Sequence, residues 1–218
     1  MESYKKLLAE NKRWAEAQAL VDPMFFTQMA AGQSPEFLWI GCADSRAPAD
    51  KITNTQPGQI FVHRNVANLV LHNDFNMLSV LQYAVEVLKV KHIMVVGHYG
   101  CGGVKASMSN DDLGLINKWV RNIKDVYQKH NDELEAIEDE TAKTNRLCEL
   151  NVVEQTRNLV KTTIVQKAWA NGHKVHIHGW ILQLDSGLIK QIFEVAPGDL
   201  SVVEPIYRYN ITPTEKES

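Results

Sequence analysis

Short apolar runs alternate with longer amphipathic stretches from about residue 37 to the region before the C-terminus. The run His92–Gly97 is almost continuously apolar, which is typical of a strand buried on both faces. The runs predict strands at Phe37–Gly41, Ile60–His63, His92–Gly97, Lys174–Trp180 and Leu188–Val195.

Helical periodicity occupies the stretches between these runs. It predicts helices at Phe75–Leu88, Leu113–Tyr127 and Asn145–Ala170, whereas the acidic segment 129–143 fits a solvated helix end or loop. Strands that alternate with helices predict an α/β fold with a mainly parallel central sheet flanked by helices on both faces. In such a sheet, ligands bind beyond the carboxyl ends of the strands.

The first 20 residues form a separate amphipathic pattern. Residues 2–20 mix Lys, Glu, Ala and Leu at helical spacing, so they predict a helical arm whose apolar stripe packs on the body or on a second subunit. We therefore expect one domain over residues 1–218, divided into a helical arm (1–34), an α/β core (35–195) and a C-terminal extension (196–218).

Composition and charge narrow the function classes. The chain has 218 residues, 44% of them hydrophobic, and a formal net charge of −3, which gives no electrostatic footprint for nucleic acid or an anionic membrane. No secretory signal or membrane-spanning run is recognisable, and three cysteines cannot all be joined in disulfides within one chain. These features predict a cytoplasmic protein with reduced thiols and neither nucleic acid nor a membrane as partner.

Two motifs follow predicted strands and carry most of the chemistry. One is Gly41-Cys42-Ala43-Asp44-Ser45-Arg46, and the other is His98-Tyr99-Gly100-Cys101-Gly102-Gly103. Two sulfurs and one imidazole suit zinc, and three protein ligands leave one position open for chemistry.

Each half of this set also has a plain structural interpretation. Cys42 alone could be a core thiol and His98 a hydrogen-bonded turn histidine, because free cysteine is commonly buried. Asp44 and Arg46 could form a weak surface ion pair, or Asp44 could cap a helix. Because both motifs stand at predicted strand ends, the metal site is the favoured interpretation. Beside a metal, Asp44 would leave the fourth position to water while it is paired with Arg46, and would block that position when released.

With these two motifs, the chain resembles the β-class carbonic anhydrases. The resemblance rests on CADSR and HYGCGG, and it extends to PGQIFVHRNVANLV, LSVLQYAVEVL and LCELNVVEQ, over roughly residues 10–182. It implies a lyase, carbonic anhydrase, in which hydroxide bound to one Zn²⁺ per chain attacks carbon dioxide and yields bicarbonate and a proton. It also implies a homodimer or a dimer of dimers.

The resemblance assigns roles residue by residue. Cys42, His98 and Cys101 match the zinc ligands, Asp44 and Arg46 match the catalytic pair, and Gln33, Phe61 and Tyr83 match the small substrate pocket near the subunit boundary.

A second bicarbonate site is only partly present in the sequence. Some β-class enzymes hold this ion with a Trp, an Arg and a Tyr. Trp39 and Arg64 match the first two, but Leu182 stands where those enzymes have the Tyr. Arg64 could equally be the partner of a nearby carboxylate.

The same ligand set is compatible with two other functions, and two further histidines could bind a metal. A hydrolase of carbon disulfide or carbonyl sulfide would use the same ligands, and a non-catalytic zinc or anion sensor would keep the site without turnover. His176 and His178 share a strand face and could bind a metal, although a polar or core-lining role is favoured. Cys148 fits packing on a helix.

Overall fold

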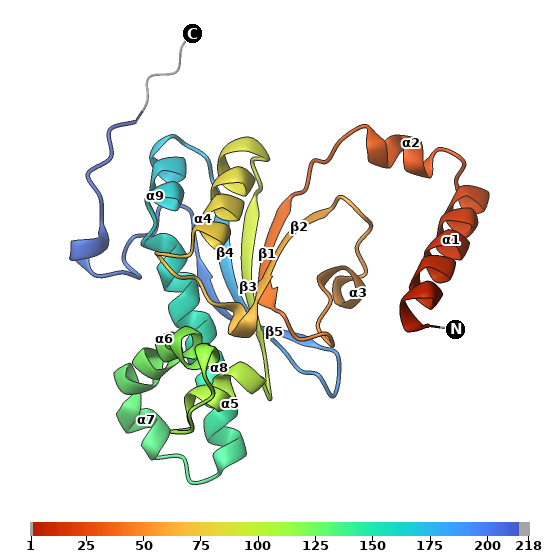
Figure 1. Cartoon of the computed structure of the whole chain (residues 1–218). Coiled ribbons are helices and arrows are strands. Elements are labelled where there is room, and N and C mark those ends of the chain that lie inside the picture. The colour runs from red at the N-terminus through yellow and green to blue at the C-terminus, as the bar shows by residue number, and fades with distance from the viewer. Residues whose placement is uncertain (1, 214–218) are drawn as a thin grey trace.

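The computed structural model describes residues 2–213, in which one twisted sheet has the strand order β2-β1-β3-β4-β5 (Figure 1). The β1–β2, β1–β3 and β3–β4 pairs are parallel, whereas β4 and β5 are antiparallel. The expectation of a mainly parallel sheet flanked by helices is therefore confirmed. The strands are β1 (Phe37–Cys42), β2 (Ile60–Asn65), β3 (His92–His98), β4 (His176–Leu182) and β5 (Ile189–Val195).

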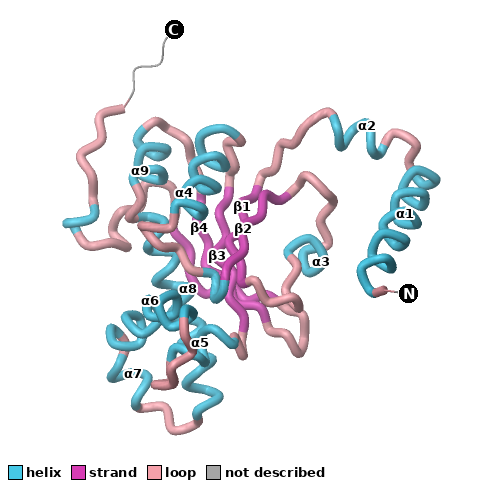
Figure 2. The backbone as a smooth tube through the Cα atoms, in the orientation of Figure 1, coloured by secondary structure: helices cyan, strands magenta, loops and turns pink. Residues whose placement is uncertain are grey.

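Helices connect and cover the strands (Figure 2). Within residues 2–213, no helix has both the length and the apolar content needed to cross a bilayer. The α-helices are α1 (Ser3–Val21), α2 (Phe25–Ala30), α3 (Ala49–Thr53), α4 (Phe75–Gln82), α5 (Gly102–Ser107), α6 (Leu115–Lys129), α7 (Asn131–Glu135), α8 (Glu140–Val160) and α9 (Thr163–Ala170). Shorter or irregular turns are η1 (Val66–Asn68), η2 (Tyr83–Val87, a π-helix) and η3 (Pro205–Tyr207).

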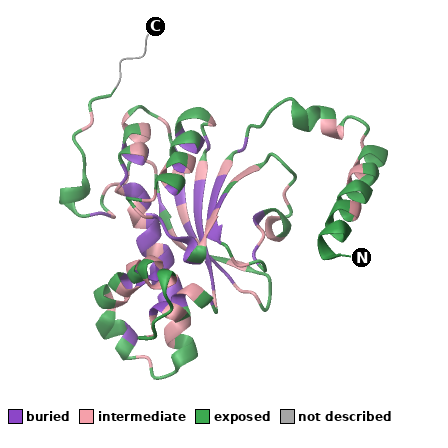
Figure 3. Cartoon of the chain, viewed as in Figure 1, coloured by how far each residue is buried: buried purple, intermediate pink, exposed green. Residues whose placement is uncertain are grey.

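The two faces of the sheet carry cores of very different size. Alternate residues such as Leu38, Ile93 and Ile177 point into the larger core, where they pack with α4, α8 and α9 (Figure 3). On the opposite face, Trp39 and Met94 belong to a small cluster to which, among the helices, only α3 contributes. The covering of the second face is thus much thinner than that of the first.

The predicted helix Asn145–Ala170 is wrong as a single element. Helix α8 ends at Val160 and α9 begins at Thr163, because Thr162 adopts an extended conformation and its hydroxyl accepts a hydrogen bond from Val165 N (3.2 Å). Helix α8 also begins earlier than expected, at Glu140, where Asp139 caps it. The acidic segment 129–143 therefore forms the end of α6, helix α7 and the first turn of α8.

The N-terminal arm is helical as expected, but it stands away from the body of the chain (Figure 1). Helix α1 has no buried residue, and Leu7 and Leu8 are 71% and 68% exposed. Only Trp14 has an extensive aromatic contact, against Phe25 and Phe26 of α2. The arm thus keeps its apolar side chains largely uncovered within one chain.

Candidate metal centre

Three potential ligands meet at the carboxyl ends of two adjacent strands. Cys42 is the last residue of β1 and His98 the last residue of β3, and these strands pair in parallel so that their ends lie side by side. Cys101 immediately precedes α5, and Gly100 before it has φ +64°, a value that favours glycine. The tight turn brings Cys101 back toward His98.

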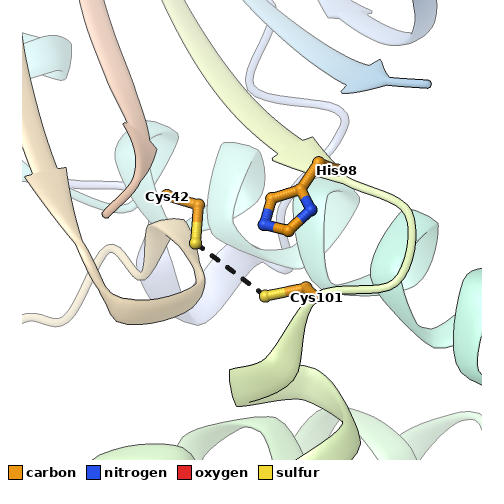
Figure 4. Close-up of side chains that lie close together, drawn as sticks. All are labelled: Cys42, His98 and Cys101. Atoms are coloured by element: carbon orange, nitrogen blue, oxygen red, sulfur yellow. Dashed lines mark hydrogen bonds between the residues drawn. The ribbon is translucent and has the colours of Figure 1, made fainter. Parts of the chain in front are cut away.

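The three side chains converge on one buried point (Figure 4). The Sγ atoms of Cys42 and Cys101 are 3.9 Å apart, and the potential ligand atoms of all three residues lie within 4.8 Å of one another. All three residues are buried. They are the only group of three or more metal-ligating side chains that meets this distance criterion between residues 2 and 213.

His98 directs its Nε2 toward this point. Its Nδ1 lies 2.9 Å from the carbonyl oxygen of Tyr99, which can only accept, so Nδ1 carries the proton. Its Nε2 is buried without a hydrogen-bond partner among the described residues. A buried lone pair of this kind is costly unless it meets a donor or a cation, which is the arrangement of a metal-ligating histidine.

The two thiols share their remaining proton. The hydrogen bond from Cys101 lowers the pKa of Cys42 to about 4, despite burial, and the same bond raises the pKa of Cys101. The bond between the two sulfurs therefore favours ionisation of Cys42 over ionisation of Cys101. A divalent cation between the two sulfurs would displace the shared proton and bind both as thiolates, so the donor set fits zinc.

Asp44 lies beside this point but is held by Arg46. The guanidinium donates from Nε to Oδ1 (2.9 Å) and from Nη2 to Oδ2 (2.7 Å), and the backbone N–H of Arg46 donates to Oδ1 as well (2.9 Å). These bonds hold the pKa of the Asp44 carboxyl well below its usual range. Asp44 Oδ2 is only 3.7 Å from His98 Nε2, so the carboxylate lies next to the three converging ligand atoms.

Arg64 binds backbone carbonyls rather than a carboxylate. Its Nε donates to the carbonyl of Cys42 (2.9 Å), and its Nη2 donates to the carbonyl of Asp44. A pairing of Arg64 with a nearby carboxylate is not seen among residues 2–213. Arg64 instead ties β2 to the segment that carries Cys42 and Asp44.

The other residues of the candidate second bicarbonate site lie on the same face of the sheet. Trp39 and Gly41 pair in register with Val62 and Arg64, so Trp39 is two residues from the position opposite Arg64. Leu182 ends β4, where it is buried and pairs in register with His98.

The structure brings together two of the three predicted pocket residues. The rings of Phe61 and Tyr83 are in contact, with centroids 5.7 Å apart. Gln33 lies in the segment between α2 and β1, where it lines a groove with Pro57 and Gly58. Within one chain, Gln33 therefore lines a groove to which neither Phe61 nor Tyr83 contributes.

A supporting network around the turn 98–101 was missed by sequence reasoning. The hydroxyl of Tyr99 donates to Glu149 of α8, which also accepts from Arg146 Nη1 (2.7 Å). Asn145 Oδ1 accepts from Gly100 N (3.2 Å). Because these partners are some 50 residues apart in sequence, no local pattern could have indicated them.

Comparison with known proteins identifies relatives of the whole chain. The family described as carbonic anhydrase matches residues 37–189. A carbonic anhydrase of Emericella nidulans is 47% identical over 206 residues, which cover 94% of this chain and 90% of the relative.

Solved structures agree with this match. One of two tetrameric β-carbonic anhydrases from Sordaria macrospora superposes with a TM-score of 0.86 at 38% identity, over 90% of this chain and 100% of the other. A β-carbonic anhydrase from Coccomyxa, solved with acetazolamide, has a TM-score of 0.85 at 37% identity, over 89% of each chain.

Proposed function

The chain belongs to the β-class carbonic anhydrases, and on that basis we propose that Cys42, His98 and Cys101 hold one zinc ion per chain for the reversible hydration of carbon dioxide. The observation that carries the zinc assignment is the buried, unpartnered Nε2 of His98 facing two cysteine sulfurs. A structural zinc site is normally closed by a fourth protein ligand, whereas here the nearest carboxylate is held by Arg46.

Zinc at this point would act as a Lewis acid and supply a water-derived nucleophile near neutral pH. Asp44, ionised and fixed by Arg46, would accept a hydrogen bond from that nucleophile and orient it toward carbon dioxide. Phe61 and Tyr83 would supply an apolar surface for an uncharged linear substrate, and Gln33 would reach the pocket from the arm segment at the boundary between subunits. Two thiolates put more negative charge on the ion than three imidazoles would, so we expect activity to favour the alkaline side.

Stopped-flow hydration of carbon dioxide tests this function directly. We expect turnover by the purified protein, loss of turnover after a strong chelator has removed the metal, and recovery when Zn²⁺ is added back. Sulfide release from carbon disulfide, measured in parallel, distinguishes a carbonic anhydrase from a hydrolase of carbon disulfide. Metal-bearing protein that hydrates no carbon dioxide would contradict the proposal.

We also propose that the arm covers a second copy of the chain. Leu7 and Leu8 of α1 are exposed, and the Sordaria macrospora relative is described as tetrameric. Light scattering should give a mass of at least two chains, not the 24.7 kDa of one. Leu8→Lys should weaken this association, whereas Lys6→Ser on the same helix should not, and a stable monomer of the unaltered protein would refute the assignment.

The second bicarbonate site is expected to be weak. Arg64 already donates to two carbonyls, and Leu182 cannot donate the hydrogen bond that a Tyr would supply. Loss of one such bond weakens binding about tenfold or more. Hydration rates against added bicarbonate, at constant pH and ionic strength, should therefore show little cooperative inhibition, and Leu182→Tyr should increase it. Strong inhibition that Leu182→Tyr leaves unchanged would contradict this.

A further inference from the structure

A group of three histidines lies at the end of the sheet opposite Cys42, His98 and Cys101. His92 begins β3 and His176 begins β4, and these two residues are direct neighbours in the parallel register. His178, two residues along β4, is the antiparallel register partner of Glu194 on β5. The register of three strands, rather than the choice of side-chain rotamers, thus places three imidazoles and a carboxylate on one face of the sheet.

The imidazoles of His92 and His178 point nitrogen to nitrogen. His92 Nδ1 and His178 Nε2 are 3.1 Å apart, and the ring of His176 lies 5.5 Å from the ring of His92. On the other side of the His178 ring, Nδ1 lies 3.9 Å from Glu194 Oε1. The His176 Nδ1 lies 4.0 Å from the same carboxylate oxygen.

A hydrogen bond between His92 and His178 still leaves one buried nitrogen of His178 without a hydrogen-bond partner among residues 2–213. His178 has a side chain that is only 12% exposed, and its Nδ1 is buried without a hydrogen-bond partner among residues 2–213. Whichever ring donates across the 3.1 Å contact, that Nδ1 lacks a partner at hydrogen-bond distance.

The spacing fits two ligands of one small cation. Two nitrogens bound to a tetrahedral ion at the usual zinc–nitrogen distance are about 3.3 Å apart, close to the observed 3.1 Å. Burial lowers the pKa of both His92 and His178, so both rings are in the neutral, ligating form at pH 7. Metal-ligating histidines usually donate their second N–H to a carboxylate, and Glu194 stands on that side of His178.

We propose that His92 Nδ1 and His178 Nε2 form a second site for a divalent transition-metal ion of the zinc type, with Glu194 orienting the His178 ring. His176, whose side chain is 39% exposed, is the imidazole that can turn inward as a third ligand. His98 follows His92 by six positions in β3, or about 20 Å along a strand, so the ion would not share ligands with the Cys42–His98–Cys101 group. It would link β3 to β4 without taking part in hydration.

Equilibrium dialysis of the intact protein against Zn²⁺, with zinc counted per chain, tests this site. We expect two zinc ions per chain in the unaltered protein and one in His92→Ala or His178→Ala. Glu194→Gln, a change at a half-exposed position that does not endanger folding, should weaken the second ion about tenfold. His72→Gln, which alters an exposed histidine outside the group, should retain both ions.

The Cys101→Ser variant separates this site from the proposed catalytic zinc. It should lose the ion of the cysteine group and keep the ion of the histidine group, so each site can fail without the other. A single zinc per chain in the unaltered protein at every Zn²⁺ concentration would overturn the proposal. So would a second ion that persists undiminished in His92→Ala, His178→Ala and Glu194→Gln.

Discussion

Replacing Cys101 by serine is expected to remove the zinc of the cysteine group and the hydration activity together. Serine keeps the size of the side chain but offers no thiolate. Among residues 2–213, no other metal-ligating side chain joins Cys42 and His98 while Arg46 holds Asp44. Removal of groups that only hydrogen-bond to a metal ligand lowers metal affinity or activity about 10–100-fold. We therefore expect loss of a ligand itself to lower the hydration rate at least about a hundredfold. Cys42→Ser and His98→Ala should behave alike.

Cys148 offers the matched control for this experiment. It is a buried cysteine on α8 whose thiol has a pKa raised to about 12 by burial, and it is outside the group of three converging ligand atoms. Cys148→Ala should therefore keep the zinc of the cysteine group and most of the activity. Metal content by emission spectroscopy, read beside the hydration rate, decides the matter: a fully active Cys101→Ser protein without metal at this centre would refute the ligand assignment.

Arg46→Ala should keep the zinc yet lose most of the hydration activity. The substitution removes both side-chain bonds to Asp44, whose carboxylate already lies 3.7 Å from His98 Nε2. Freed from the guanidinium, the Asp44 carboxylate would be able to bind the proposed zinc itself and so exclude the nucleophile. We expect a fall of about 10–100-fold in kcat/KM, the range seen when groups around a metal are removed.

The geometry of the pair supplies the controls. Arg46→Lys keeps a positive charge but loses the planar, bidentate contact with the carboxylate. Its activity should therefore lie between that of the unaltered protein and that of Arg46→Ala. Arg121→Ala removes an exposed arginine that is paired with Asp125 at 3.7 Å, and it should leave the rate unchanged. If Arg46→Ala hydrated carbon dioxide as fast as the unaltered protein, Asp44 and Arg46 would form only an ordinary surface ion pair.

The sequence by itself determined the strands of the sheet and the meeting of the two motifs. Apolar runs such as His92–Gly97 are typical of central strands, and parallel neighbouring strands bring their carboxyl ends to one edge of the sheet. The contacts of Cys42 with Cys101 and of Asp44 with Arg46 follow from that edge and from short local turns. Local chemistry and strand direction were therefore sufficient to predict the candidate metal centre.

Only the tertiary structure decided the contacts between distant segments. The bond from Tyr99 to Glu149, the donation from Arg64 to two carbonyls and the approach of His92 to His178 join residues far apart in sequence. The break at Thr162 likewise depends on one hydroxyl capping a new helix inside an otherwise continuous apolar pattern. Periodicity reports which face of an element is buried, whereas register and packing set which partner it meets, and these are fixed only when the whole chain has folded.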